Sequence, residues 1–362
     1  MLQSRPVSAK SSSERRPILS RGDRFGTHRV LEPKGVLPQP AARVDNDFTR
    51  LFRGELLLAV EKLNVDAASF RQMVEARGTG NVAAAVLETV ASRGKQHNPV
   101  TGSGGMLLGR VLEFDPHRAD AGSLTVGTRV ASLVSLSLTP LRIDRVLGVV
   151  HESAQLDVEG EAVLFESAPY VKLPDDMSER VALAALDVAG AAPQVARLVK
   201  PGHVVVILGA GGKSGILCAA EARRTGGSDA FVVGVESFPQ AAAELAALGL
   251  CDAVIEHDGR DALGIREAVL RATGGREADV TIACMNVGDA EMSAILITRE
   301  RGCAYFFSMS TSFTKAALGA EGVGKDIDLL MGNGYVKDNA MATLDLLRAM
   351  PAVRALFEKR YG

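Results

Sequence analysis

The second half of the chain alternates short apolar runs with amphipathic stretches, and this alternation restricts the possible folds more than any other feature. The runs expected to form strands are residues 203–208, 230–235, 253–255, 279–282 and 303–307. The stretches expected to form helices between them are residues 216–224, 239–248 and 264–273. Continuous apolar strands that alternate with helices are typical of a parallel sheet covered on both faces. The sequence therefore predicts an α/β chain with a doubly wound parallel sheet over residues 176–334.

A glycine-rich loop lies between the first of these strands and its helix. Residues 209–215 read Gly-Ala-Gly-Gly-Lys-Ser-Gly. Such a loop lets a pyrophosphate approach the backbone, and the N-terminus of the next helix supplies N–H donors and a positive dipole. This context predicts the dinucleotide-binding loop of a Rossmann domain, although the spacing departs from G-x-G-x-x-G. The candidate cofactor ligands in the loop are Gly209, Gly211, Gly212, Lys213, Ser214 and Gly215.

An acidic residue follows the second strand of this half. Glu236 comes 27 residues after Gly209, where a carboxylate can accept a hydrogen bond from the ribose 2′-hydroxyl of NAD. A negative charge there would repel the 2′-phosphate of NADP, so NAD is the expected cofactor and NADP the alternative. Glu236 also has a structural interpretation, because it precedes Pro239 and can cap the helix that begins there.

Two segments resemble a nucleoside-triphosphate loop without meeting its requirements. Residues 212–214 read Gly-Lys-Ser, but position 207 is Ile where that loop needs Gly. Residues 319–325 have the required spacing, but Asp326 stands where a Ser or Thr hydroxyl would bind magnesium. A nucleotide triphosphatase is therefore disfavoured.

Charge and composition narrow the range of partners. The formal net charge is −2, and aromatic residues make up 4% of the chain, with no Trp. Proteins that bind nucleic acids or anionic membranes usually carry a basic excess, and base stacking needs aromatic side chains. No apolar run reaches the about 18 residues that a membrane helix needs. We expect a small-molecule substrate, with neither nucleic acid nor membrane as a partner.

The four cysteines are separated along the chain, without a CxxC motif or a Cys/His cluster. Structural zinc needs such clusters, so we expect no metal site. The spacing also gives no disulfide framework and fits a reducing compartment. The expected location is the cytoplasm.

The N-terminal half begins differently. Residues 1–22 are rich in Arg and Ser and poor in acids, and we expect a disordered tail, with an organelle transit peptide as the alternative. From residue 23 the pattern is rich in strands, with runs at 55–60 and 126–134. One helix is expected at 67–93, with Asp66 as its N-cap, and another at 179–198.

Five features occur together along the chain: the β-rich first part, Val126-Gly-Thr-Arg-Val130, Val171-Lys-Leu-Pro174, Lys200-Pro-Gly202 and the glycine loop. Together they resemble the medium-chain dehydrogenase/reductase superfamily. Longer segments narrow this resemblance, at residues 26–40, 98–109, 132–144, 306–326 and 332–335. They are similar to the L-erythro-3,5-diaminohexanoate dehydrogenases of lysine degradation, and the resemblance covers residues 24–362.

This resemblance implies a GroES-like β-rich catalytic domain, formed by residues 23–175 and 335–362, beside a Rossmann domain at 176–334. Zinc-binding members of the superfamily carry Cys, His and Glu ligands where this chain has residues 63–70, which contain none of them. The chain therefore resembles a zinc-free branch. The implied reaction oxidises the 3-amino group of 3,5-diaminohexanoate with NAD(P), and water converts the imine to 5-amino-3-oxohexanoate and ammonia. A homodimer or a higher homo-oligomer is also implied.

The resemblance places candidate substrate ligands in three segments. The candidates are Asn64, Asp66 and Ser69, then Thr101 and Ser103 in a glycine-rich turn, and finally Ser135, Thr139 and Arg142. Arg142 is the candidate for the substrate carboxylate, because a guanidinium can bind it with two hydrogen bonds. Each segment has a structural alternative, namely a helix cap for Asp66, a β-turn for the glycine-rich segment and an ordinary surface position for Arg142.

A base must take the ammonium proton, and its candidates are Asp66, Asp187, Glu166 and Lys315. Glu166 and Asp187 lie in apolar stretches, where a carboxylate is costly unless it is paired or functional. A satisfied structural acid is the alternative for both. Lys315 can act as a base only if burial lowers its pKa, and otherwise would contact a phosphate or a carboxylate. Asn286 and Ser308 follow strands and are candidate cofactor ligands, because strand carboxyl ends face the ligand crevice.

Two other functions remain open. One is a zinc-free enoyl or quinone reductase of the same fold that uses NADPH. The other is a non-catalytic nucleotide-binding protein, such as a redox sensor or a crystallin-like structural protein, although acids and a basic group around an apolar cleft argue against it. The isolated His28 and His97 are expected to be structural or exposed, and the sequence does not identify the base.

Overall fold

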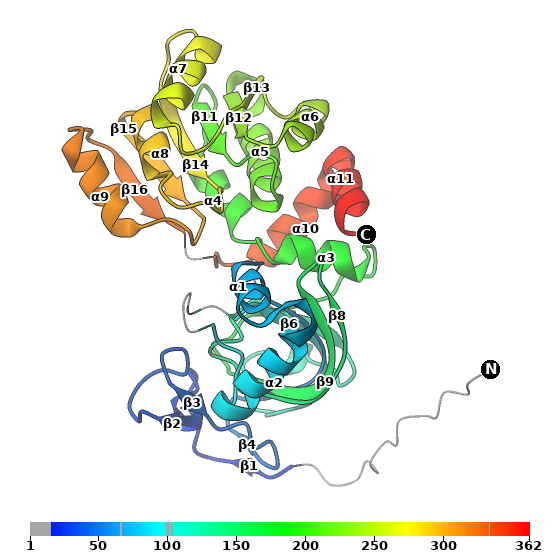
Figure 1. Ribbon diagram of the computed structural model, residues 1–362. Coiled ribbons are helices and arrows are strands. Elements are labelled where there is room, and N and C mark those ends of the chain that lie inside the picture. The colour runs from blue at the N-terminus through cyan, green and yellow to red at the C-terminus, as the bar shows by residue number, and fades with distance from the viewer. Residues whose placement is uncertain (1–15, 66, 99–101, 103, 333) are drawn as a thin grey trace. The chain divides into compact units, whose positions relative to one another are not determined.

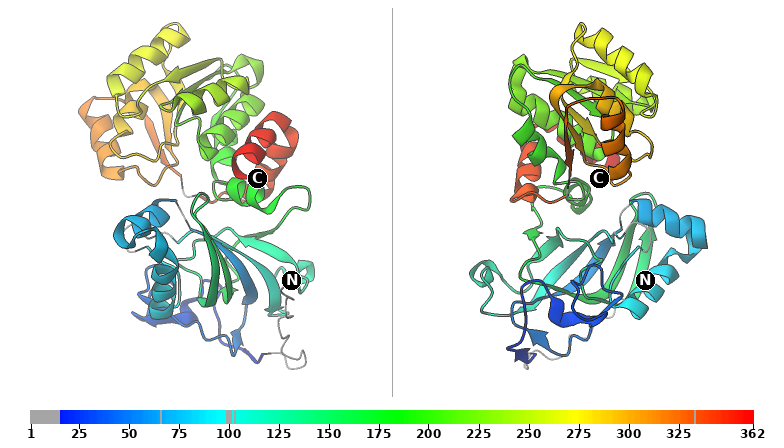
Figure 2. Two further views of the ribbon diagram at one scale, coloured as in Figure 1. Left: turned by 45° about the vertical axis from the view of Figure 1, so that its right-hand side comes forward. Right: turned by 90° about the vertical axis from the view of Figure 1, so that its left-hand side faces the viewer.

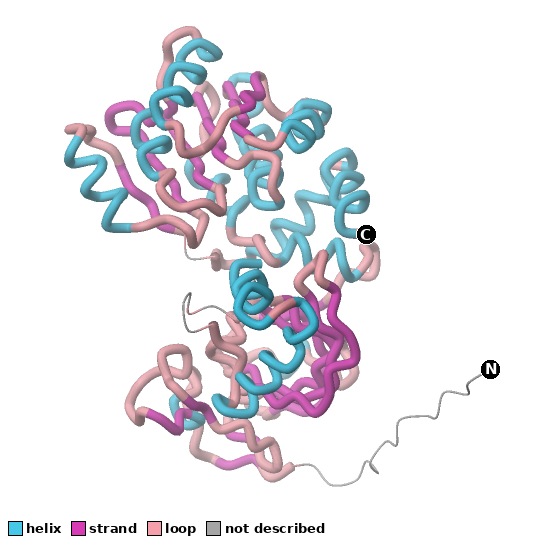
Figure 3. The backbone as a smooth tube through the Cα atoms, viewed as in Figure 1, coloured by secondary structure: helices cyan, strands magenta, loops and turns pink. Residues whose placement is uncertain are grey.

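The computed structural model describes residues 16–65, 67–98, 102, 104–332 and 334–362. Its contacts divide the chain into two compact units, the first ending at Leu173 and the second running from Pro174 to Gly362. Each unit has its own main sheet and its own apolar core. Figure 3 distinguishes the helices and strands of both units by colour.

The main sheet of the first unit has six strands in the order β10-β7-β6-β5-β9-β8, and all neighbouring strands are antiparallel. These strands are β5 (Leu56–Asn64), β6 (Met106–Phe114), β7 (Arg129–Ser132), β8 (Leu141–Val150), β9 (Gln155–Leu164) and β10 (Tyr170–Lys172). Two short pairs lie outside it, β1 (Ile18–Leu19) with β4 (Leu51–Phe52) and β2 (Val30–Glu32) with β3 (Arg43–Val44). The α-helices of this unit are α1 (Ala67–Arg77) and α2 (Val82–Arg93).

The first part of strand β5 is buried on both faces, which explains the continuous apolar sequence of Leu56–Val60. Leu56 and Leu58 belong to the main core of the unit. Leu57, which points to the opposite face, packs in a smaller cluster with Phe48 and Phe165. An antiparallel strand thus carries the apolar run that is more typical of a parallel sheet.

The sheet of the second unit has six parallel strands in the order β13-β12-β11-β14-β15-β16. They are β11 (Val204–Leu208), β12 (Phe231–Glu236), β13 (Ala253–Glu256), β14 (Ala278–Ala283), β15 (Thr298–Phe306) and β16 (Asp328–Met331). Numbered from β11, this is the order 3-2-1-4-5-6 of a doubly wound Rossmann sheet. The predicted fold class is therefore confirmed, and the strand order reverses between β11 and β14.

Nine α-helices complete the described part of the second unit. They are α3 (Glu179–Leu186), α4 (Ala191–Leu198), α5 (Lys213–Gly226), α6 (Pro239–Ala247), α7 (Ala262–Thr273), α8 (Glu291–Ile297), α9 (Phe313–Gly322), α10 (Asn339–Ala349) and α11 (Pro351–Tyr361). Because crossovers between parallel strands are right-handed, the connections before and after the reversal cover opposite faces of the sheet. Figure 2 shows helices on both sides of this sheet.

Two predicted helices are each divided in two. The stretch 67–93 forms α1 and α2, with a turn at 78–81 between them. The stretch 179–198 forms α3 and α4, which are bent by 49° relative to each other. The second break brings Gly190 against the chain near α10, where a Cβ at position 190 would lie 2.3 Å from the Gly334 carbonyl oxygen. Close backbone packing therefore decides the position of the break, which apolar periodicity does not show.

Two segments differ from the expected domain limits. Part of the expected tail pairs as β1 with β4, and Arg16 Nη2 donates to Glu161 Oε1 at 2.7 Å, whereas residues 1–15 lie outside the described residues. Helices α10 and α11, expected with the first domain, pack on α3, α4 and α5 within the second unit. The side chains of Leu344, Leu347 and Phe357 are almost completely buried, so apolar packing holds these helices in that unit.

Three further observations concern membranes, metals and thiols. In the described part of the chain, no helix taken singly has the length and hydropathy to cross a bilayer, and α3 with α4 meets that test only as a bent pair. No group of three His, Cys, Asp or Glu side chains in the described ranges could hold a metal ion. The cysteines are separated in sequence, but the Sγ atoms of Cys218 and Cys284 lie 3.8 Å apart as thiols.

Candidate functional site

The glycine loop joins β11 to α5 where the strand order reverses (Figure 1). Gly209 follows β11 with a φ of +75°, a conformation that glycine adopts without steric cost. A Cβ at position 215 would lie 2.2 Å from the Gly209 carbonyl oxygen, so α5 approaches the strand this closely only because residue 215 has no side chain. At Gly212 the nearest atom to such a Cβ would be 3.7 Å away. The loop therefore presents accessible backbone beside the N-terminus of α5.

Glu236 ends β12 with its side chain turned toward this loop. Its Oε2 accepts a hydrogen bond from the Gly211 N–H at 2.9 Å, and its Oε1 accepts from the N–H groups of Ser237 and Phe238 at 2.8 and 3.1 Å. The residue is only 7% exposed. The carboxylate thus binds the backbone before α6 without capping that helix, whose N-cap is Phe238, and it also fixes the glycine loop. The contact with a ribose hydroxyl stays a prediction.

The predicted acid Asp187 is paired with a residue of the loop. It follows α3, and its Oδ2 accepts a hydrogen bond from Lys213 Nζ, at the start of α5, at 2.6 Å. Burial alone would lower the pKa of Lys213, but the Asp187 carboxylate raises it above its usual value. The Tyr361 ring also lies 5.9 Å from this ammonium group. Asp187 is thus paired with Lys213, a candidate cofactor ligand next to Ser214, and its role as a base stays a prediction.

The loops after β14 and β15 carry the two remaining cofactor candidates. Asn286 Oδ1 accepts a hydrogen bond from the Ser310 hydroxyl at 2.7 Å, and Ser308 Oγ accepts one from the Ser310 N–H at 3.2 Å. Ser310 therefore ties the two loops together. A small cavity beside them is lined by Ala283, Met285, Val287, Ala290, Glu291, Phe306 and Thr311.

Lys315 does not meet the condition for a base. Its side chain is exposed on α9 and pairs with Asp289, and this hydrogen bond raises the pKa of Lys315 above its usual value. A general base near neutral pH needs a lowered lysine pKa. Of the two roles expected for Lys315, contact with an anion therefore stays a prediction.

In the first unit, buried polar side chains gather where β5 ends. Asn64 Oδ1 accepts a hydrogen bond from Gln155 Nε2 at 3.0 Å, and Ser69 Oγ accepts one from Asn98 Nδ2 at 2.7 Å. Asn98 Nδ2 also donates to Gln72 Oε1 at 2.9 Å. The candidates Asn64 and Ser69 thus each accept a hydrogen bond from a side-chain amide. Sequence reasoning missed the amides Gln155, Asn98 and Gln72, because single amides carry no recognisable spacing.

Glycines bring a second candidate segment to the same end of the sheet. A Cβ at position 104 would lie 2.6 Å from the Ser137 nitrogen, and one at position 105 would lie 2.1 Å from the Asn64 carbonyl oxygen. The hydroxyl oxygens of Ser135 and Ser137 are 2.8 Å apart. The buried Thr139 hydroxyl donates to the Ser135 carbonyl at 3.1 Å and so fixes this turn.

Arg142 lies at the other end of strand β8. Its register partner is Glu161, whereas Val150 pairs with Gln155 at the Asn64 end, so the two ends are roughly 25 Å apart at about 3.3 Å per residue. Arg142 donates to Glu161 Oε2 at 2.9 Å and to Asp144 Oδ1 at 3.0 Å. The surface alternative therefore describes Arg142, and the structure keeps it apart from the candidate Asn64.

The remaining candidates of the first unit divide into two groups. Glu166 was expected in apolar surroundings, but it is exposed directly after the buried Phe165, because the strand ends there and the chain turns outward. Asp66, Thr101 and Ser103 lie outside the described residues.

The segment before the glycine turn contains polar atoms without partners. Gln96 Oε1 and His97 Nδ1 are buried and, in the described part of the chain, make no hydrogen bond. Burial lowers the pKa of His97, and the nearby charges of Lys95 and Arg93 lower it further. The sequence shows His97 as an isolated histidine, so this environment could not have been predicted.

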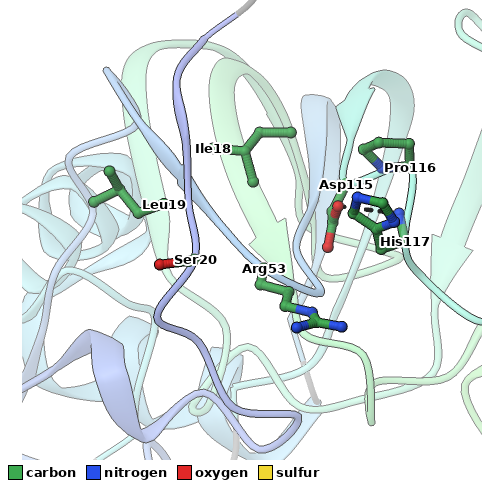
Figure 4. A pocket seen from close by; sticks show the side chains of 7 residues that line it. All are labelled: Ile18, Leu19, Ser20, Arg53, Asp115, Pro116 and His117. Carbon is green, nitrogen blue, oxygen red and sulfur yellow. Dashed lines mark hydrogen bonds between the residues drawn. The ribbon is translucent and has the colours of Figure 1, made fainter.

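A cavity of about 370 Å³ lies elsewhere in the first unit (Figure 4). Its lining includes Arg53, next to the start of β5, and Asp115, just after the end of β6. The register pairs Leu56 with Phe114 at this end and Asn64 with Met106 at the other. The cavity therefore lies at the opposite end of the sheet from Asn64.

Comparisons with known proteins identify the family. A model of the L-erythro-3,5-diaminohexanoate dehydrogenase N-terminal domain matches residues 28–174. L-erythro-3,5-diaminohexanoate dehydrogenase of Acetoanaerobium sticklandii is 51% identical over 343 residues, covering 94% of this chain and 99% of that protein. The chain belongs to the L-erythro-3,5-diaminohexanoate dehydrogenase family. The Fusobacterium nucleatum dehydrogenase of this name is 49% identical over 95% of this chain and its own full length, and the protein is accordingly an oxidoreductase.

Solved structures support the fold of this dehydrogenase family member. A mycobacterial protein in complex with NADPH aligns with a TM-score of 0.56 at 17% identity, over 85% of this chain and 89% of that one. A quinone oxidoreductase of Pseudomonas syringae pv. tomato aligns with a TM-score of 0.53 at 19% identity, over 85% and 82%. These similarities concern the fold alone.

Proposed function

We propose that this enzyme oxidises L-erythro-3,5-diaminohexanoate at C3 with a nicotinamide cofactor and releases 5-amino-3-oxohexanoate and ammonia, as a step of lysine degradation. The observation that carries this proposal is the 51% identity to a dehydrogenase of that name over 94% of the chain. The amides at the end of β5 are consistent with it, because their carbonyl oxygens can accept hydrogen bonds from an ammonium group.

The glycine loop fits a nicotinamide dinucleotide. The backbone at Gly212 is accessible, and the first N–H groups of α5 have no acceptor within the helix. We propose that this loop holds the pyrophosphate and that the charge of Glu236 favours NAD over NADP. The cofactor, when bound, supplies the acceptor for the hydride from C3. Asn286 and Ser308 are proposed to contact its other end from the loops after β14 and β15.

The pair of Asp187 and Lys213 is the proposed route for the ammonium proton. The Asp187 carboxylate is the group that would take the proton, and the Lys213 ammonium 2.6 Å away holds it beside the cofactor loop. Lys315 is held protonated by Asp289 and suits an anion contact instead. The exposed Glu166 and the Asp66 position are the other proposed bases.

The test is a direct assay of the purified protein. With diaminohexanoate and NAD, absorbance at 340 nm should rise with the stoichiometric release of ammonia, and NADP should support a slower rise. Asp187→Asn should slow turnover about 100-fold if the pair carries the proton, in the range typical of general base catalysis. Ser228→Ala, a change in an exposed turn of the same unit, is the matched control.

Two outcomes would contradict the proposal. One is the absence of any absorbance change with either cofactor. The other is NADPH consumption with a quinone or an enoyl thioester in place of diaminohexanoate, which would support the reductase alternative.

A further inference from the structure

The glycine loop is held from two sides by residues distant in sequence. The Gly211 N–H donates to Glu236 Oε2 at 2.9 Å. The Gly211 carbonyl accepts a hydrogen bond from Arg360 Nη1 at 2.7 Å. Two successive peptide groups of the loop are thus fixed by opposite charges, one at the end of β12 and the other in the last turn of α11.

Arg360 is itself held in place. Its Nε donates to Glu244 Oε2, on α6, at 2.9 Å, and only 17% of its side chain is exposed. Lys359 Nζ donates to the other oxygen of Glu244 at 2.8 Å. Hydrogen bonds from Lys359 and Arg360 lower the pKa of Glu244 to about 2, so this carboxylate is ionised at neutral pH. One guanidinium therefore connects α11, α6 and the glycine loop.

This arrangement bears on ligand binding for an entropic reason. Glycine-rich segments lose much conformational freedom when they are ordered, and a ligand that must order its own loop binds more weakly. A loop that is already fixed by Glu236 and Arg360 avoids most of that loss. A positive charge beside Gly211 also favours an anion at the N-terminus of α5.

We propose that Arg360 is a positioning residue for the cofactor loop, so that affinity for the dinucleotide depends on the last turn of the chain. This inference rests on the proposed function, because it assumes that the loop holds a pyrophosphate. Arg360 acts through Gly211, and the proposal requires no contact with the cofactor itself.

Lys359 provides a matched control, because it shares Glu244 with Arg360 but does not contact Gly211. The dissociation constant of NADH is measured by the emission of the bound nicotinamide, which is convenient in a protein without Trp. Arg360→Ala should raise this constant about tenfold, the effect of losing one charged hydrogen bond. Lys359→Ala should change it by less than about twofold, since an exposed ion pair contributes little. The KM for diaminohexanoate should stay the same in both variants.

A second measurement does not need a ligand. Amide hydrogen exchange at residues 209–215 of the unliganded enzyme should be faster in Arg360→Ala than in the wild type and in Lys359→Ala. If Arg360→Ala lowers the melting temperature strongly, the Arg360→Lys variant is measured in its place. It should raise the dissociation constant of NADH by a smaller but measurable factor.

The outcomes separate this inference from the proposed function. Equal NADH affinity and equal loop exchange in the two alanine variants would overturn the positioning role. An equal rise in the dissociation constant in both would assign the effect to Glu244 and would also overturn it. A wild type that binds neither NADH nor NADPH would refute the proposed function, whatever the exchange data show.

Discussion

At the scale of single residues, the partner of a charge decides what the charge can do. Asp187, Lys315 and Arg142 are each the residue type that the proposed chemistry needs. In the structure, Asp187 is bound to Lys213, and Lys315 to Asp289. Arg142 is bound to two carboxylates on the surface of the first unit. Residue type is visible in the sequence, but these partners are 2 to 26 positions away and their pairing depends on the fold.

A buried ion pair of the first unit gives a prediction at this scale. Arg29 and Glu55 are both completely buried and share hydrogen bonds of 2.8 and 2.7 Å. Arg29→Met should destabilise the protein by roughly 3–5 kcal/mol, because it leaves the buried Glu55 carboxylate with only His28 and the Phe52 N–H as partners. Arg50→Met, which removes an exposed pair with Asp47, should cost less than about 1 kcal/mol. Urea unfolding measures both, and similar losses would contradict the prediction.

The same pair sets the direction of a pH dependence. Burial alone would raise the pKa of Glu55, but hydrogen bonds from Arg29 and His28 lower it below the ordinary value of 4.5. A lowered folded pKa means that the stabilisation is complete above pH 4.5 and is lost as the pH falls through the folded value. The melting temperature of the wild type should therefore fall more steeply below pH 4.5 than that of Arg29→Met/Glu55→Gln. If the melting temperatures of the two proteins fall in parallel below pH 4.5, the Glu55 carboxylate is not the cause of the pH dependence.

At the scale of elements, backbone contacts set boundaries that side-chain patterns do not reveal. The stretch 179–198 has one apolar pattern and forms two helices, since Gly190 packs on the backbone of Gly334. The strand–loop–helix unit at residues 204–226 was predicted well, because its signals are all local. The prediction of a single helix at 179–198 failed because a long-range contact breaks it. The prediction for 204–226 succeeded because no such contact was needed.

Two helical glycines give a matched prediction at this scale. A Cβ at position 215 would lie 2.2 Å from the Gly209 carbonyl oxygen, whereas at Gly322 nothing lies within 4 Å. Gly322→Ala should stabilise the protein by about 0.5–1 kcal/mol through helix propensity. Gly215→Ala should destabilise it by roughly 1–3 kcal/mol, because the glycine loop must move away from α5. Thermal unfolding tests both variants. Stabilisation by Gly215→Ala would show that the glycine loop moves away from α5 at little energetic cost.

At the scale of the whole molecule, the chain consists of two units with separate cores. The C-terminal helices α10 and α11 belong by their contacts to the second unit, although the family resemblance led us to expect them with the first. Their last turn carries Arg360, which contacts the glycine loop. The homo-oligomer stays a prediction of that resemblance.

This division predicts that residues 174–362 fold without the first unit. The fragment should unfold in one cooperative transition, because it retains its sheet, its covering helices and its core. A fragment of residues 174–334 should fail to do so, since it loses Leu344, Leu347 and Phe357, each worth about 1.5–3 kcal/mol when buried. Circular dichroism melting compares the two, and equal stability would show that α10 and α11 contribute little to the unit.

The parallel sheet, the glycine loop and the position of Glu236 could be predicted from the sequence, because each rests on neighbouring residues or on a fixed spacing that local physics converts into structure. The family was recognised there by resemblance alone. The folded structure was needed to learn which charges are paired, which amides lie at the end of β5 and where α11 packs. These contacts join residues far apart in the chain, and Gly211 and Arg360, for example, are 149 positions apart. No local pattern encodes such pairs, because the energy of each contact exists only once the two elements have been brought together by the rest of the fold.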